Sequence, residues 1–153
     1  NQHLALEKMS SSLRKKLESK QAIHSALVPY SPGGGYGSKD REMGRSMDIQ
    51  ASDEAFSKQL HPIIKQHPET KREGIYGTIG YIIGIDGMDS KDALKLLMEL
   101  SAWQCQEEFV YRHKWKKNML IMWDNRSVLH RATGGYEGQE RLLHRTTIAA
   151  YKE

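Results

Sequence analysis

The sequence predicts a mainly β fold with helices packed on its outside. Two stretches, 119–123 and 141–151, are rich in apolar or β-branched residues, and each follows residues typical of a turn. Between Ala93 and Trp103, apolar residues recur at helical spacing, which predicts an amphipathic helix. Such strands and helices are expected to share one core, because 153 residues are about one domain's worth of chain.

The N-terminal part predicts a helix, an extended segment and a loop. Residues 2–20 have the pattern of an amphipathic helix on the outside of a sheet, with a cap-forming cluster at Ser10–Ser12. Residues 21–30 are expected to be extended. Residues 31–50 are rich in glycine and serine and poor in apolar residues, so they predict a long mobile loop.

The middle of the chain predicts short strands and the clearest helix. Pro62 cannot donate to a β ladder, so 60–64 is expected to be an edge strand, and Ser90 is expected to cap the helix of residues 90–103. The remaining expected elements are a helical turn at 53–58, a turn at 67–70, a strand with a bulge or bend at 75–85 and a strand at 109–113.

Composition bounds the class of protein. The net charge is +4, but the lysines are scattered rather than gathered in a stripe, so most of the charge is interpreted as solvated surface and no nucleic acid is expected as a partner. A basic nucleic-acid binder stays open as an alternative, and it requires steeply salt-dependent binding. No apolar run approaches the roughly 20 residues of a membrane helix. The single Cys105 excludes an internal disulfide and favours a reducing, cytoplasmic compartment.

Three side chains near the C-terminal end are candidate ligand-binding residues. Arg141 and Arg145 would share one face of a strand, with their Cα atoms roughly 13 Å apart, which suits two anionic groups side by side. His130 supplies an imidazole whose neutral nitrogen is suited to a metal. From spacing alone, the same residues fit better a surface strand that carries two solvated arginines and a histidine bonded to a backbone carbonyl.

Residues 123–147 resemble the C-terminal signature of the Fe(II)/2-oxoglutarate-dependent dioxygenases of the taurine dioxygenase and 2,4-dichlorophenoxyacetate dioxygenase (TauD/TfdA) family. In that family a Trp-Asp-Asn-Arg strand leads to the last iron ligand, a histidine, and His130 matches it. The arginine matched by Arg141 binds the distal carboxylate of 2-oxoglutarate. The arginine matched by Arg145 contacts the anionic group of the substrate.

The resemblance extends over nearly the whole chain. His61-Pro, His67-Pro-Glu-Thr, the helix of residues 88–103 and the stretch 108–115 follow the family's C-terminal half in order. Lys71 stands where the family often has glycine, a departure expected to affect only the turn. The resemblance implies that residues 1–153 are the C-terminal portion of a single double-stranded β-helix (jelly-roll) domain, here incomplete. It also implies hydroxylation of a small anionic organic substrate, of sulfonate or aryloxyalkanoate type, with molecular oxygen.

One part of the family's iron site is missing from the sequence. The family's other two ligands come as a His-x-Asp pair, and no His-x-Asp occurs in this chain. The nearest pattern, His67-Pro68-Glu69, falls at the structural turn. Asn1 aligns after the family's pair, so we expect weak or no binding of Fe(II) and 2-oxoglutarate by this chain and no activity alone.

Two consequences follow from an incomplete jelly-roll. Exposed sheet edges favour pairing with another copy, so a homo-oligomer is expected. The three candidate side chains are expected to converge on one concavity, open where the missing strands would lie. A catalytically inactive, truncated homologue that serves as an anion-binding or interaction module remains the alternative function.

Overall fold

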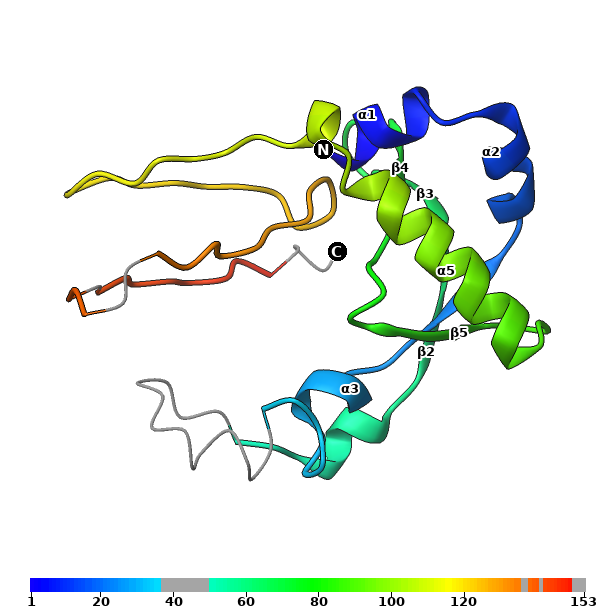
Figure 1. Ribbon diagram of the computed structural model, residues 1–153, viewed down its shortest axis with the longest axis horizontal. Helices are drawn as coiled ribbons and strands as arrows, with labels where there is room; N and C mark the ends of the chain where they lie inside the picture. Colours follow the sequence, from blue (N-terminus) through cyan, green and yellow to red (C-terminus); the bar gives the residue numbers. More distant parts are fainter. Residues whose placement is uncertain (37–49, 136–137, 141, 150–153) are drawn as a thin grey trace.

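The computed structural model describes residues 1–36, 50–135, 138–140 and 142–149, which form two small antiparallel sheets covered by helices (Figure 1). These residues combine helix and sheet rather than being mainly β, and a complete jelly-roll is not seen among them. The helices are α1 (Gln2–Glu7), α2 (Ser11–Leu17), α3 (Leu27–Tyr30) and α5 (Ser90–Gln104), with 3-10 helices η1 (Asp53–Phe56) and η2 (Glu107–Phe109). The strands are β1 (Gln21–His24), β2 (Gln59–Pro62), β3 (Ile64–Gln66), β4 (Glu73–Ile75) and β5 (Ile82–Ile85).

The larger sheet has the order β2-β1-β5, and the smaller one pairs β3 with β4. Ala22 of β1 lies opposite His61 on one side and Ile85 on the other. The predicted edge strand is confirmed in β2, but the chain passes from β2 to β3 at Ile63, which is fully buried. That position therefore joins the two sheets within one core.

The predicted helices are confirmed with different ends. Ser10 caps α2 by accepting the Leu13 N–H at 3.2 Å, so the segment 2–20 is two helices rather than one. Asp89, not Ser90, caps α5. Trp103 packs on Phe109 and donates its indole N–H to the Ala5 carbonyl at 2.7 Å, which ties α5 to α1 as core packing.

The expected strand at 75–85 is wrong in one respect, because β4 and β5 belong to different sheets. Gly77 lies between them with φ at +96°, and a Cβ at this position would overlap the His24 ring. A side chain is therefore excluded where the chain changes sheet.

The predicted strands at 109–113, 119–123 and 141–151 are not found in the described part of the chain. Residues 110–123 and 142–149, here called the extended arms, leave the core without joining either sheet (Figure 1). Leu120 is 92% exposed and Ile148 is 82% exposed, so the expectation of a buried strand at 119–123 is also wrong. An apolar pattern shows which face a strand would bury, but a strand also needs a hydrogen-bonding neighbour, and the described residues supply none.

Two local expectations have clear outcomes. The charged turn before residue 119 is confirmed at Lys117–Asn118, where Asn118 has φ at +61°. Most of the predicted loop of residues 31–50 lies outside the described residues, as do Arg141 and residues 150–151 of the predicted strand. None of the described helices has the length and apolar content needed to cross a bilayer.

Candidate functional site

The Trp-Asp-Asn-Arg stretch, predicted to be a strand, is a turn. The Asp124 carbonyl accepts hydrogen bonds from the N–H groups of Ser127 at 3.0 Å and Val128 at 3.2 Å. Its side-chain Oδ1 accepts the N–H of Arg126 at 2.8 Å. Aspartate commonly closes turns in this way, since its short carboxylate reaches the backbone two residues on. Residues 124–127 are called the Asp124 turn.

The Asp124 carboxylate is the electrostatic centre of this turn. Arg126 donates to it from Nε at 2.9 Å and from Nη2 at 2.7 Å, and His67 donates from Nε2 at 2.9 Å. The hydrogen bonds from Arg126 and then His67 hold the pKa of Asp124 well below its usual value. Arg126 also reaches Glu69 at 3.0 Å. The turn is therefore bound to the segment that follows β3.

His67 is a structural residue rather than a metal ligand. It is buried, and its Nδ1 accepts the N–H groups of Glu69 at 3.2 Å and Thr70 at 3.1 Å. Because Nδ1 accepts, Nε2 carries the proton that is donated to Asp124. Both ring nitrogens thus have protein partners, which agrees with the predicted structural turn at 67–70.

A second set of contacts fastens the Asp124 turn to α1. The Ser127 carbonyl accepts the Gln2 N–H at 3.0 Å, and the Ser127 hydroxyl lies 3.2 Å from His3 Nε2. His3 Nδ1 lies 2.7 Å from the Glu73 carbonyl, so Nδ1 donates to that carbonyl and Nε2 accepts from the hydroxyl. Sequence reasoning missed these contacts, although Asp and Asn side by side are a recognised turn signal.

His130 lies three residues beyond this turn and is exposed. Its ring packs against Trp123, with centroids 4.9 Å apart and the planes tilted by 53°. Trp123 in turn donates its indole N–H to the Asn125 side chain at 2.9 Å. Neither nitrogen of His130 hydrogen-bonds to a residue in the described ranges, so the imidazole is oriented by packing and accessible to a ligand.

Of the two candidate arginines, the structure describes Arg145 but not Arg141. Arg145 is exposed and forms no ion pair with any residue that the structure describes, while its charge acts on the hydroxyl of Tyr81. Arg141 lies outside the described residues. The expected convergence of His130, Arg141 and Arg145 on one concavity therefore stays a prediction.

The donor set for a metal is incomplete among the described residues. No group of three His, Cys, Asp or Glu side chains there is arranged to hold a metal ion. The sequence also has no His-x-Asp pair. A facial triad needs two histidines and a carboxylate, and His130 supplies one imidazole, so these residues do not fit a complete iron site.

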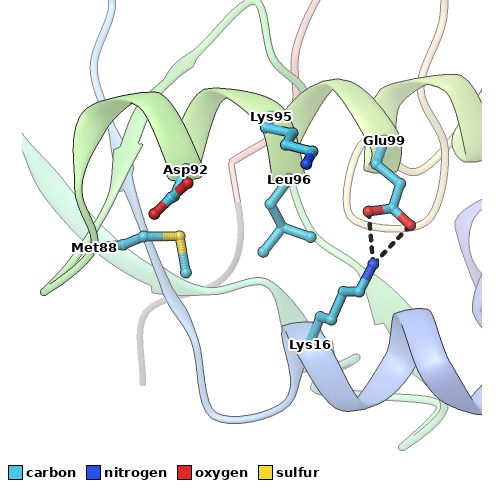
Figure 2. A pocket seen from close by; sticks show the side chains of 6 residues that line it. All are labelled: Lys16, Met88, Asp92, Lys95, Leu96 and Glu99. Atoms are coloured by element: carbon cyan, nitrogen blue, oxygen red, sulfur yellow. Dashed lines mark hydrogen bonds and ion pairs between the residues drawn. The ribbon is translucent and has the colours of Figure 1, made fainter.

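A shallow groove lies elsewhere, between α2 and α5 (Figure 2). Lys16 and Glu99 face each other across it in an ion pair at 3.0 Å. None of the candidate ligand-binding residues lines this groove, whose other lining residues are Met88, Asp92, Lys95 and Leu96. Its charges are matched across the groove, so it offers no excess positive charge for an anion.

Comparisons with known proteins show a family match over nearly the whole chain. The family described as "Taurine catabolism dioxygenase TauD, TfdA family" matches residues 1–147. The (S)-phenoxypropionate/alpha-ketoglutarate-dioxygenase of Sphingobium herbicidovorans is 35% identical over 91 residues, which are 59% of this chain and 31% of the relative. The alpha-ketoglutarate-dependent dioxygenase cnsM of Penicillium expansum is 27% identical over 154 residues, 98% of this chain and 40% of the relative.

A solved structure shares the fold. The crystal structure of AAD-2 in complex with Mn(II) and N-oxalylglycine superposes with a TM-score of 0.63 at 24% identity, over 83% of this chain and 46% of that one. The chain spans about a third of the length of the curated relatives it matches.

Proposed function

Because this chain belongs to the TauD/TfdA family of 2-oxoglutarate-dependent dioxygenases, we propose that it carries the anion-binding part of such an enzyme. The natural protein that contains it oxidises a small anionic organic substrate, a sulfonate or an aryloxyalkanoate, with 2-oxoglutarate and molecular oxygen. The proposal is carried by His130, an exposed imidazole that packs against Trp123 and that the sequence resemblance matches to the family's last iron ligand.

The candidate residues have separate roles in this proposal. His130 supplies one metal ligand, Arg141 binds the distal carboxylate of 2-oxoglutarate, and Arg145 binds the anionic group of the substrate. Guanidinium groups suit both anions, since two parallel N–H donors match two carboxylate or sulfonate oxygens. The described residues provide no other part of an iron site, so no further ligand is assigned to this chain.

The Asp124 turn acts as a positioning device for His130. Its contacts with His67 and α1 fix the start of the segment that carries the imidazole. Asn125 orients Trp123, and Trp123 restricts the ring of His130 on one side. A ligand held in advance loses less conformational freedom when it binds a metal.

The test distinguishes the proposed roles of Arg141 and Arg145, and it uses the natural protein that contains this chain. Succinate formation is measured against 2-oxoglutarate and against the organic anion. Arg141→Ala is expected to raise the KM for 2-oxoglutarate, and Arg145→Ala is expected to raise the KM for the organic substrate. Each change removes a charge-assisted contact, on the order of 1.5–3 kcal/mol. Equal effects of both changes on both KM values would contradict the assigned roles.

A second candidate function is an anion-binding module without metal chemistry. The observation that favours it is the lack of a three-donor group among the described residues, together with the missing His-x-Asp pair. Such a module binds 2-oxoglutarate equally well with and without Fe(II) and forms no succinate. An Fe(II)-dependent gain in affinity for 2-oxoglutarate would exclude it.

A further inference from the structure

The extended arm of residues 110–123 carries positive charge and no negative charge. It contains no aspartate or glutamate, and its basic residues lie in its first half, at Arg112, Lys114, Lys116 and Lys117. Arg112 binds Glu107 of η2, with Nη2 2.6 Å from Oε1. The three lysines are exposed and form no ion pair with any residue in the ranges that the structure describes. Their charge is therefore open to an anionic partner.

Aromatic rings alternate with these basic residues. The ring centroids of Tyr111 and His113 are 6.0 Å apart, and those of His113 and Trp115 are 5.3 Å apart with perpendicular planes. Alternate side chains of an extended backbone point to the same side, and these contacts place the three rings together. Tyr111 and Trp115 are both exposed, so the rings are accessible along the arm.

The second half of the same arm is apolar. Residues 119–123 contain no charged or polar side chain except the indole N–H of Trp123. Leu120 is 92% exposed and Met122 is 83% exposed. His113 Nε2 donates to Met119 Sδ at 3.2 Å, since a thioether can only accept, and this contact joins the apolar half to the aromatic half. In Figure 1 the arm projects away from both sheets and turns back on itself.

Three kinds of partner are compatible with part of this surface. A second copy would bring like charges of the two arms together, which is unfavourable. A single-stranded nucleic acid supplies phosphates for the lysines and bases that stack on the rings, but it leaves Leu120 and Met122 without an apolar environment. An anionic lipid surface accounts for all three features. Its headgroups attract lysines, its interface favours tryptophan and tyrosine, and its acyl chains take up aliphatic side chains.

We propose that the arm of residues 110–123 is a docking element that binds the surface of an anionic lipid bilayer. Leu120 and Met122 enter the boundary between headgroups and acyl chains, and Trp115 lies at the level of the headgroups. The three lysines contact the lipid phosphates and carboxylates. Such binding is peripheral and requires no spanning helix. It goes beyond the proposed enzymatic role and depends on neither the metal nor 2-oxoglutarate.

Cosedimentation of the full chain with vesicles tests this inference. We compare vesicles of phosphatidylcholine alone with vesicles that also contain phosphatidylserine. The chain is expected to prefer the phosphatidylserine vesicles and to lose this preference at high salt. Changing all three lysines (Lys114→Gln, Lys116→Gln and Lys117→Gln) is expected to weaken binding about fivefold per lysine, or roughly 100-fold together.

Two matched pairs of substitutions test the apolar part of the arm. Leu120→Ser with Met122→Ser is expected to weaken binding roughly tenfold or more. Leu94→Ser with Met98→Ser is the control, because these residues form an exposed apolar pair on α5, and binding should be unchanged. Vesicles are expected to shift the tryptophan emission to the blue, and Trp115→Phe is expected to reduce this shift. Circular dichroism verifies that each variant is folded.

Equal binding to the two kinds of vesicle, or no binding to either, overturns the inference. Arm variants that bind as tightly as the unchanged chain also overturn it, as does an equal loss in the α5 control. An oligothymidine probe tests the nucleic-acid partner directly. Binding of oligothymidine without binding to phosphatidylserine vesicles would reject the lipid surface and assign the arm to single-stranded nucleic acid.

Discussion

Nε2 of His67 and Oδ2 of Asp124 lie 2.9 Å apart, although 57 residues separate them in the sequence. This hydrogen bond joins the buried His67, which follows β3, to the segment that carries His130. Because Arg126 donates to the same carboxylate, one aspartate connects the core to the turn that precedes the candidate metal ligand.

Asp124→Asn is the most direct test of that connection. The amide retains the shape of the side chain but loses the negative charge that Arg126 and His67 share. We expect the free energy of unfolding of the full chain to fall by about 1–2 kcal/mol, at the low end for charged hydrogen bonds because the site is partly exposed. Urea denaturation measures the change. Asp86→Asn is the control, since Asp86 is exposed outside this network, and an equal loss there would contradict the connection.

The free energy of unfolding is expected to fall as the pH is lowered from about 7.5 to about 5.5. His24 and His61 lie on one face of β1 and β2 with ring centroids 5.0 Å apart. Burial, and then the charges of His61 and Lys65, lower the pKa of His24, while burial and Lys65 lower the pKa of His61. The unfolded chain, with imidazoles of ordinary pKa, therefore binds more protons than the folded chain below about pH 6.5, so acid favours unfolding.

The urea midpoint measured across this pH range checks the expectation. His24→Gln is expected to flatten the dependence, because it removes the more buried of the two titrating rings. His144→Gln, a change at an exposed histidine of the extended arms, serves as the control and should leave the slope as it is. A midpoint that rises toward acid pH would refute the assignment.

Lys71→Gly is expected to stabilise the chain. Lys71 has φ at +61°, a conformation that costs an L-residue roughly 1–2 kcal/mol relative to glycine. Part of that gain is offset by the greater freedom of glycine in the unfolded chain, so we expect a net gain of about 0.5–1 kcal/mol. Lysine in place of the glycine that the family often has at position 71 is therefore expected to destabilise the turn.

Thermal or urea unfolding measures the effect of Lys71→Gly. Lys95→Gly provides the matched control, because Lys95 is exposed in the middle of α5 and glycine there is expected to cost about 1 kcal/mol. Opposite signs for the two substitutions are the predicted result. Destabilisation by both would show that the backbone at position 71 is not strained.

Metal binding by this chain alone is expected to be weak. His130 is the one candidate ligand, and a single imidazole competes poorly with water for Fe(II). Anaerobic calorimetry with Fe(II) and 2-oxoglutarate measures the affinity, and His130→Ala is the matched variant. Tight one-to-one binding would show that this chain supplies further ligands.

Elements set by local chemistry were predictable from the sequence. Ser10 accepts a backbone N–H of the next turn, and the apolar spacing from Ala93 to Leu100 places one face of α5 in the core. Both signals lie within a few residues of the structure they determine. The turn at Asn118 is local in the same sense.

Features that depend on distant partners were not predictable. Residues 119–123 have a strand-like composition, but pairing requires a second backbone that composition does not specify. The family resemblance implies a strand at Trp-Asp-Asn-Arg, whereas the hydrogen bonds of Asp124 to Arg126 and His67 make this stretch a turn. The hydrogen bond between the hydroxyls of Tyr81 and Tyr30 spans 51 residues, and no spacing rule connects them.

The buried core ends at Phe109, and among the described residues after it no side chain is fully buried. His130 and Arg145 therefore lie on polypeptide that contributes little to the folding free energy, except at the Asp124 turn. Substitutions along this stretch are expected to change the free energy of unfolding little, because they need no repacking around Leu17 or Leu97. Randomising the extended arms alone would therefore test whether the proposed anion specificity can change while the scaffold stays unchanged.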